Sequence, residues 1–203
     1  MKKSLFLLVC LFLLLSTANN LFATMISATA LGNSTPVATT TADTLLNNDF
    51  TITGSVGTSV GDGINEYTTW TFDFTSDTNY YDDFASETLT SAWLELYLTP
   101  TDPYISTDSV SITGLTGITA GIQSLPVGSL GYINIDLMNF YSPGNIMGSL
   151  SALGGIGMLY EDDAILSQAT LTLTAAPVPE PATLLLFGAG LTGLAAFSRK
   201  KKK

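Results

Sequence analysis

The chain has 203 residues and a formal net charge of −10 at pH 7, with all seven basic residues at its two ends and no histidine. Sixteen of its seventeen acidic residues lie between positions 43 and 163, where no cation balances them. A segment without Lys, Arg or His offers no basic groove for nucleic acid and no arginine clamp for phosphate. It also lacks the histidine of serine and cysteine hydrolases and of ordinary zinc sites, so we expect neither an enzyme nor a nucleic-acid partner.

The first 23 residues have the pattern of a secretory signal peptide. Lys2 and Lys3 give a positive start, residues 5–15 form an apolar segment, and Ala18 and Ala23 are candidate signal-peptidase sites. An apolar segment this short favours a cleaved signal over a permanent anchor. The chain's only cysteine lies inside the signal, so we expect a mature protein without disulfides. The Sec translocon and signal peptidase are the partners expected for this step.

Residues 24–176 are predicted to form one extracytoplasmic domain, an antiparallel β-sandwich of jelly-roll or immunoglobulin-like topology. Short segments of alternating or apolar residues are separated by Gly, Pro and Asp turns, a pattern typical of all-β domains. The expected strands cover residues 68–74, 89–98, 110–112, 118–122, 132–137, 156–160 and 169–174. Residues 20–43 suit a leader or a loosely held first strand, and residues 146–153 suit a short helix or a strand.

Acidic residues near the expected strand ends form a candidate calcium site. Asp62, Glu66, Asp73 and Asp77 offer the hard oxygen ligands that Ca²⁺ prefers, and Ca²⁺ is the only cofactor that the sequence suggests. Their spacing matches neither an EF-hand nor a nonapeptide repeat, so solvated loop acids are the alternative. Because no cation balances these groups, we also expect crowding to raise carboxylate pKa values in the folded state.

The strand expected over residues 89–98 carries a candidate glycan platform. Its even positions are apolar, which places Trp93, Glu95 and Tyr97 together on the opposite face. Two aromatic rings beside a carboxylate can hold a sugar, whereas the alternative is that the rings fill a second core. No motif around the carboxylates indicates a glycosidase pair.

The last expected strand alternates threonine with leucine. Thr170, Thr172 and Thr174 share a face, as on the flat surfaces of ice-binding proteins. Such a surface needs many rungs in register, and the sequence offers one. Threonine on the solvent side of a strand is also ordinary, so ice binding is the weakest of the three site hypotheses.

The C-terminus combines three features in a fixed order. Prolines around Glu180 hold Pro179-Glu180-Pro181 extended, and residues 182–198 form an apolar segment suited to a short transmembrane helix. The basic tail resists translocation and is expected to stop in the cytoplasm. It consists of Arg199, Lys200, Lys201, Lys202 and Lys203. An ordinary C-terminal membrane anchor is the alternative reading.

This tail, residues 177–203, resembles the PEP-CTERM sorting signal. The resemblance implies recognition by a membrane-embedded exosortase, with Pro179, Glu180 and Pro181 as the motif. It implies a Gram-negative cell, an inner-membrane intermediate facing the periplasm, and then a place on the cell surface or outside the cell. Proteins with this tail co-occur with exopolysaccharide production, and β-sandwich domains commonly precede it.

The sequence therefore predicts an exported, exosortase-processed protein of the surface or extracellular matrix. Its β-sandwich is expected to serve a structural or adhesive role associated with exopolysaccharide or biofilm. The alternative is a carbohydrate-binding module, calcium-dependent or not.

Overall fold

The computed structural model describes residues 23–41, 43–54, 57–77, 84, 88–102, 108–119, 125–150, 154–176, 188 and 190. Thr24–Ala175 form one compact unit. All the buried hydrophobic residues of the described core belong to Thr24–Ala175. None of the helices within the described ranges has the length and apolar character needed to cross a membrane.

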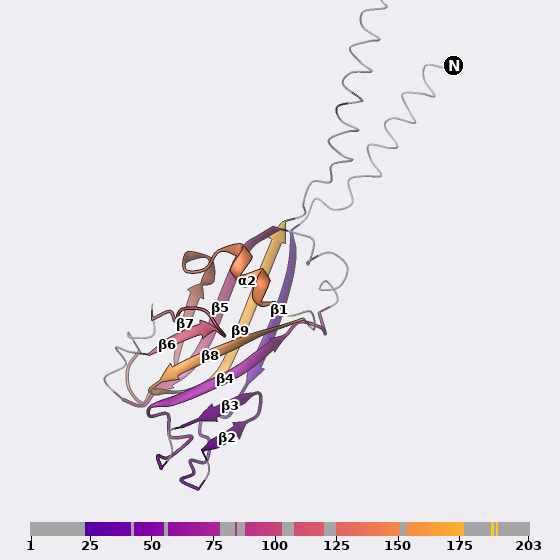
Figure 1. The fold of residues 1–203 in the computed structure, drawn as a ribbon. Helices are drawn as coiled ribbons and strands as arrows, with labels where there is room; N and C mark the ends of the chain where they lie inside the picture. The colour runs from indigo at the N-terminus through magenta and orange to yellow at the C-terminus, as the bar shows by residue number, and fades with distance from the viewer. Residues whose placement is uncertain are drawn as a thin grey trace, which may run out of the picture. The chain divides into compact units, whose positions relative to one another are not determined.

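Residues 24–176 form nine strands in two antiparallel sheets that pack face to face (Figure 1). The four-stranded sheet has the order β1-β9-β5-β7, and the five-stranded sheet has the order β2-β3-β4-β8-β6. The strands are β1 (Thr24–Leu31), β2 (Thr44–Asn47), β3 (Phe50–Thr53), β4 (Glu66–Asp73), β5 (Thr88–Pro100), β6 (Ser109–Ile112), β7 (Gly131–Asp136), β8 (Gly155–Asp162) and β9 (Ala164–Ala176). The predicted antiparallel β-sandwich is confirmed.

The core lies between the sheets because alternate residues of each strand point inward. In β4, the buried positions alternate strictly with exposed ones. The Trp70 ring stands edge-on to Phe50 at 5.5 Å and to Phe72 at 5.9 Å between ring centroids. Side chains of this size contribute about 1.5–3 kcal/mol each when fully buried, so this aromatic cluster on the inner face of the five-stranded sheet stabilises the core. The outward positions are left for the two outer faces of the sandwich.

Strand β1 is an edge strand, paired only with β9. Two carboxylates from elsewhere in the fold accept hydrogen bonds from its outward backbone N–H groups. Asp77 Oδ2 accepts from Ser27 N at 3.2 Å, and Asp49 Oδ2 accepts from Leu31 N at 2.8 Å. The side chains of β1 continue the threonine face of β9, since the Thr29 and Thr170 hydroxyls lie 3.0 Å apart.

The structure decides two open alternatives and adds one element to the sequence-based prediction. Residues 20–43 contain a full strand, β1, which was one of the two alternatives for that segment. The β2–β3 hairpin was not predicted, although its two-residue turn carries the signal: Asn48 takes the left-handed φ of 55° that such turns require. The ambiguous residues 146–153 contribute to the helix α2 (Pro143–Ser149). Ser142 caps this helix by accepting from Asn145 N, and Pro143 occupies its first turn.

Candidate functional site

The outward residues of β5 do lie on one face. Trp93 is 42% exposed, while Glu95 and Tyr97 are half-buried beside it. Strand β7 (Gly131–Asp136) pairs with β5 and places Tyr132 opposite Tyr97. The two tyrosine rings tilt at 50° with centroids 5.0 Å apart. Trp93, Glu95, Tyr97 and Tyr132 together are called the β5–β7 platform below.

Tyr132 was not predicted as part of this surface. The alternation of β7 put its side chain on the outward face, but the sequence did not give the register between β5 and β7. The Tyr132 hydroxyl donates to Glu95 Oε1 at 3.2 Å. Partial burial, together with this hydrogen bond and the Glu95 charge, raises the pKa of Tyr132 above its usual range. Its hydroxyl therefore stays protonated at neutral pH and holds the Glu95 carboxylate in place.

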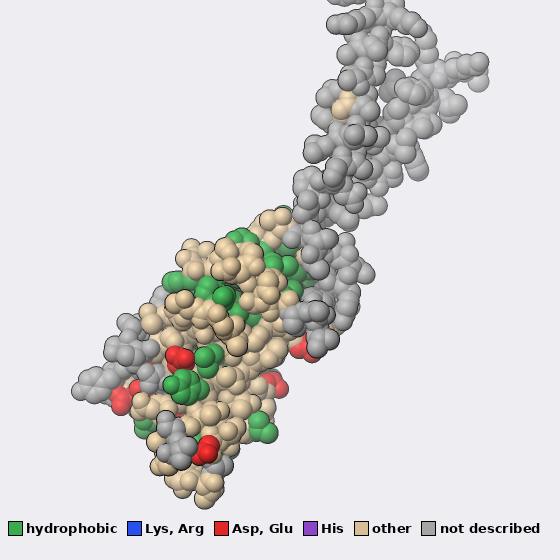
Figure 2. Space-filling view, viewed as in Figure 1, with side chains coloured by type: hydrophobic (Ala, Val, Ile, Leu, Met, Phe, Trp, Pro, Cys, Tyr) green, Lys and Arg blue, Asp and Glu red, His purple; other side chains and the backbone are tan. Residues whose placement is uncertain are grey.

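This arrangement suits a neutral sugar. Aromatic rings give a flat apolar surface, and a carboxylate can accept hydrogen bonds from ligand hydroxyls in addition to the one from Tyr132. No Lys, Arg or His occurs between residues 24 and 176. Figure 2 accordingly shows acidic side chains on the face in view and no basic side chain among the coloured residues. An anionic ligand would meet repulsion with no compensating cation.

The structure does not bring the four candidate calcium ligands together. Glu66 is buried, 3% exposed, and turns into its own loop. Its carboxylate accepts from the backbone N–H groups of Gly61, of Asp62 at 3.2 Å and of Gly63 at 3.1 Å. A carboxylate surrounded by N–H donors has few lone pairs left for a cation. Burial raises the pKa of Glu66, and the hydrogen bond from Gly61 is the largest effect that opposes it.

The other two candidates lie at and beyond the far end of β4. Asp73 Oδ1 accepts from Thr75 N at 2.8 Å, and the Thr75 hydrogen bonds lower the pKa of the Asp73 carboxyl. Asp77 reaches the edge of β1. Glu66 and Asp73 are the first and last residues of β4, so the length of that strand separates the two pairs. Within the described residues, no three acidic side chains gather in a way that could hold a metal ion.

The candidate processing residues have different positions relative to the described ranges. Ala23 is exposed and immediately precedes β1, so a cut there would leave the sandwich intact. Ala18, the Pro179-Glu180-Pro181 motif, the helix expected over residues 182–198 and the basic tail lie outside the described residues, apart from positions 188 and 190. Those predictions stand on the sequence.

Comparison with known proteins gives different results for the sandwich and for the C-terminal tail. No curated protein matches the chain. A solved family 11 carbohydrate-binding module of a cellulosomal cellulase of Clostridium thermocellum is 11% identical, with 76% of this chain and 89% of that one covered and a TM-score of 0.21. The Clostridium thermocellum module in complex with a β-1,3-1,4-mixed-linked tetrasaccharide is 10% identical, with 78% and 89% covered and a TM-score of 0.20. TM-scores this low carry no inference about function.

The C-terminal segment gives a direct match. The family model for the PEP-CTERM protein-sorting motif covers residues 177–201. These residues include the proline-bounded glutamate, the apolar segment and three of the five terminal basic residues. The chain therefore carries a PEP-CTERM protein-sorting motif behind its β-sandwich, as its sequence predicted, and the motif marks it as an exosortase substrate.

Proposed function

We propose that this protein is exported, processed at both ends and placed on the cell surface or in the extracellular matrix. There its β-sandwich acts as an adhesive component that holds neutral exopolysaccharide. The sorting motif supports the route, and the β5–β7 platform is the observation that supports the binding function. Before processing, the protein is a transient intermediate anchored in the inner membrane, with the sandwich facing the periplasm and the basic tail in the cytoplasm.

The processing step has a direct test. In a host with an exosortase, we expect the exported protein to begin after Ala18 or Ala23 and to end near Pro179-Glu180-Pro181. Intact-mass spectrometry of the protein from the medium and the surface fraction measures both ends. A strain lacking the exosortase is the matched control, in which the C-terminus should be retained. Exported protein that still ends in Lys203 in the exosortase-positive host would contradict the proposal.

The binding step is tested with two tyrosines of equal exposure. Tyr132 belongs to the platform and Tyr67 lies on the outer face of the opposite sheet, and each is 47% exposed. The measurement is electrophoretic mobility in native gels that contain hydroxyethylcellulose, dextran or galactomannan, which retain a protein that binds them. We expect Tyr132→Ala to be retained less than wild type, because it removes a ring and the Glu95 hydrogen bond. Tyr67→Ala should have the same mobility as wild type. Equal retention of the two variants would contradict the proposal that the β5–β7 platform binds polysaccharide.

We further propose that the platform binds without catalysis and without a metal. Glu95 is held by Tyr132, and the nearby Asp136 accepts from Met138 N at 3.0 Å, so both carboxylates act as fixed acceptors. Retention in the polysaccharide gels should therefore be the same with Ca²⁺ and with a chelator. The gels should show no shortening of the polysaccharide after long incubation. Chelator-sensitive binding would support the calcium-dependent alternative instead.

A further inference from the structure

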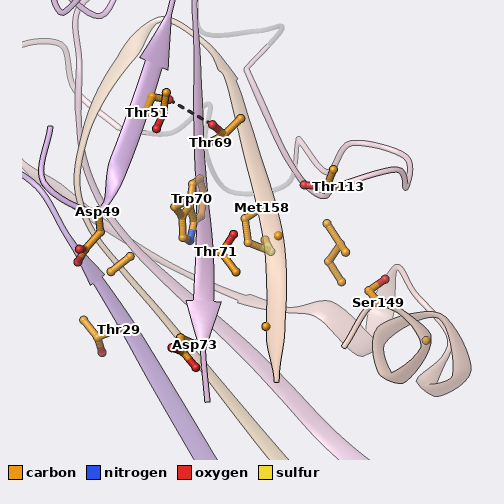
Figure 3. A pocket seen from close by; sticks show the side chains of 15 residues that line it. Thr29, Asp49, Thr51, Thr69, Trp70, Thr71, Asp73, Thr113, Ser149 and Met158 are labelled. Atoms are coloured by element: carbon orange, nitrogen blue, oxygen red, sulfur yellow. Dashed lines mark hydrogen bonds between the residues drawn. The ribbon is translucent and has the colours of Figure 1, made fainter. Parts of the chain in front are cut away.

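A groove of about 1080 Å³ lies on the outer face of the five-stranded sheet, away from the β5–β7 platform. Its middle is formed by outward residues of β4 and β8, where Thr71 faces Gly157 and Asp73 faces Gly155. One end lies against β1 and β3, and the other lies against α2 and the turn after β6 (Figure 3). Small-molecule pockets measure about 300–1,000 Å³, so this groove is large enough for an extended oligomer.

Hydroxyl groups dominate the lining. Figure 3 shows Thr51, Thr69 and Thr71 along the strands, with Thr113 and Ser149 at the far end. The glycines of β8 contribute no side chains, which leaves a flat floor between these hydroxyls. At Gly157 the backbone would accept a side chain, but an added Cβ would lie 3.1 Å from Thr113 Oγ1 and would fill the floor.

The threonine and serine hydroxyls indicate the kind of ligand. The Trp70 ring turns inward against Phe50 and Phe72, which leaves the side chains of its neighbours Thr69 and Thr71 to face the groove. Because each hydroxyl can both donate and accept a hydrogen bond, these walls match a ligand that is itself rich in hydroxyl groups.

The ligand must also be uncharged. Asp49 and Asp73 line the groove and no cation exists between residues 24 and 176, so uronates, sulfates and phosphates are repelled. We propose that this groove is a second binding site for a neutral polysaccharide chain, so that one domain bridges two chains on opposite faces. The bridging role rests on the proposed function of the β5–β7 platform, whereas the groove site does not.

Isothermal titration of the exported protein with hydroxyethylcellulose, dextran and galactomannan oligosaccharides tests the groove. Wild-type protein should bind two oligosaccharides per domain. Gly157→Val should lower this to one by filling the floor, and Tyr132→Ala should lower it to one by removing the platform. Thr71→Val should weaken the groove site about three- to tenfold, since it loses one hydrogen bond. Thr53→Val, an outward threonine of β3 outside the groove, is the matched control and should behave as wild type.

Bridging gives a second readout, because wild-type protein should raise the viscosity of long galactomannan and the single-site variants should not.

The outcomes separate the two proposals. A wild-type stoichiometry of one, abolished by Tyr132→Ala and unchanged by Gly157→Val, overturns the groove site and leaves the platform intact. A stoichiometry of one that is abolished by Gly157→Val and unchanged by Tyr132→Ala overturns the platform and leaves the groove. Wild-type protein that binds none of the three probes overturns both.

Discussion

The two ends of β4 carry carboxylates in opposite settings. Glu66 begins the strand, is buried, and has its pKa raised by the loss of water around it. Asp73 ends the strand in solvent, and Thr75 lowers its pKa through side-chain and backbone hydrogen bonds. In sequence the two look alike, as acids beside a turn. The comparison shows that the loop at each end, rather than the overall density of negative charge, decides what a carboxylate does here.

The loop before β4 is built around Glu66. Gly63 takes a φ of +72°, which favours glycine, and an added Cβ there would lie 2.9 Å from Ile165 and Thr101. This conformation points the backbone N–H groups of the loop at the Glu66 carboxylate. Asp163 secures the same loop by accepting from Asn65 N at 2.8 Å. The expected rise of carboxylate pKa values through crowding does not describe either residue. Burial is the main cause that raises the pKa of Glu66, with the Asp62 charge a smaller one, and the Thr75 hydrogen bonds lower the pKa of Asp73.

Removing the Glu66 carboxylate should give the largest effect on stability. Glu66→Ala leaves three loop N–H groups without their acceptor in a buried place, so we expect a loss of about 2–4 kcal/mol in the free energy of unfolding. Chemical denaturation of the exported protein at pH 7 measures it. Glu95→Ala, at a half-buried acid of β5, is the control and should cost much less. Similar losses for both variants would mean that the Glu66 loop is not a stabilising element.

The pH dependence of stability sharpens the comparison. Because the folded pKa of Glu66 lies above its ordinary value of 4.5, the native state binds this proton more tightly than the unfolded state does. The corresponding stabilisation is complete below the unfolded pKa and is lost as the pH rises through the folded pKa. Glu66→Gln should remove this part of the pH dependence. Melting temperatures from pH 4 to pH 7 test it, and identical slopes for wild type and Glu66→Gln would contradict it.

Asp73 should show a smaller effect of opposite sign. Its lowered pKa gives a contribution that is present above the ordinary value of 3.8 and is lost as the pH falls through the folded pKa. Asp73→Asn should therefore lower the melting temperature slightly at pH 7 and leave it unchanged in strong acid. The effect is small because solvent screens an exposed carboxylate. If Asp73→Asn lowered the melting temperature at pH 7 as much as Glu66→Ala does, the two ends of β4 would not differ in the way proposed.

The sequence predicted the sandwich because its long strands alternate cleanly. In β5 the pattern correctly separated the buried leucines from Trp93, Glu95 and Tyr97. It could not add Tyr132, because membership of the platform depends on the register of two strands more than 30 residues apart in the chain. The inward turn of Glu66 was missed for a similar reason, since local spacing does not show where backbone N–H groups point. Strands β2 and β3 have four residues each, which is too few for an alternating pattern to be recognised in the sequence.

The groove was missed because its lining comes from β1, β3, β4, β8 and α2, which only the fold brings together. Thr51, Thr71 and Thr113 each look like ordinary solvent-facing threonines in the sequence. The one sequence feature that pointed to the groove was the pair Gly155 and Gly157, since glycine in a strand often marks a place where a ligand or another backbone approaches closely. The sequence does not show which residues lie opposite those glycines on the neighbouring strand, so it could not indicate which face of the sheet carries the groove.

The carboxylates at the edge of β1 have a consequence for any two copies of this domain that meet. An open strand edge is a template on which a strand of another molecule can add. Asp49 and Asp77 already accept hydrogen bonds from that edge, and both are negatively charged. An incoming strand of a second copy would have to displace the two carboxylates and bring its own acidic surface close to them. We therefore expect two copies of this domain to meet through their side-chain surfaces rather than to join their β1 edges into one continuous sheet.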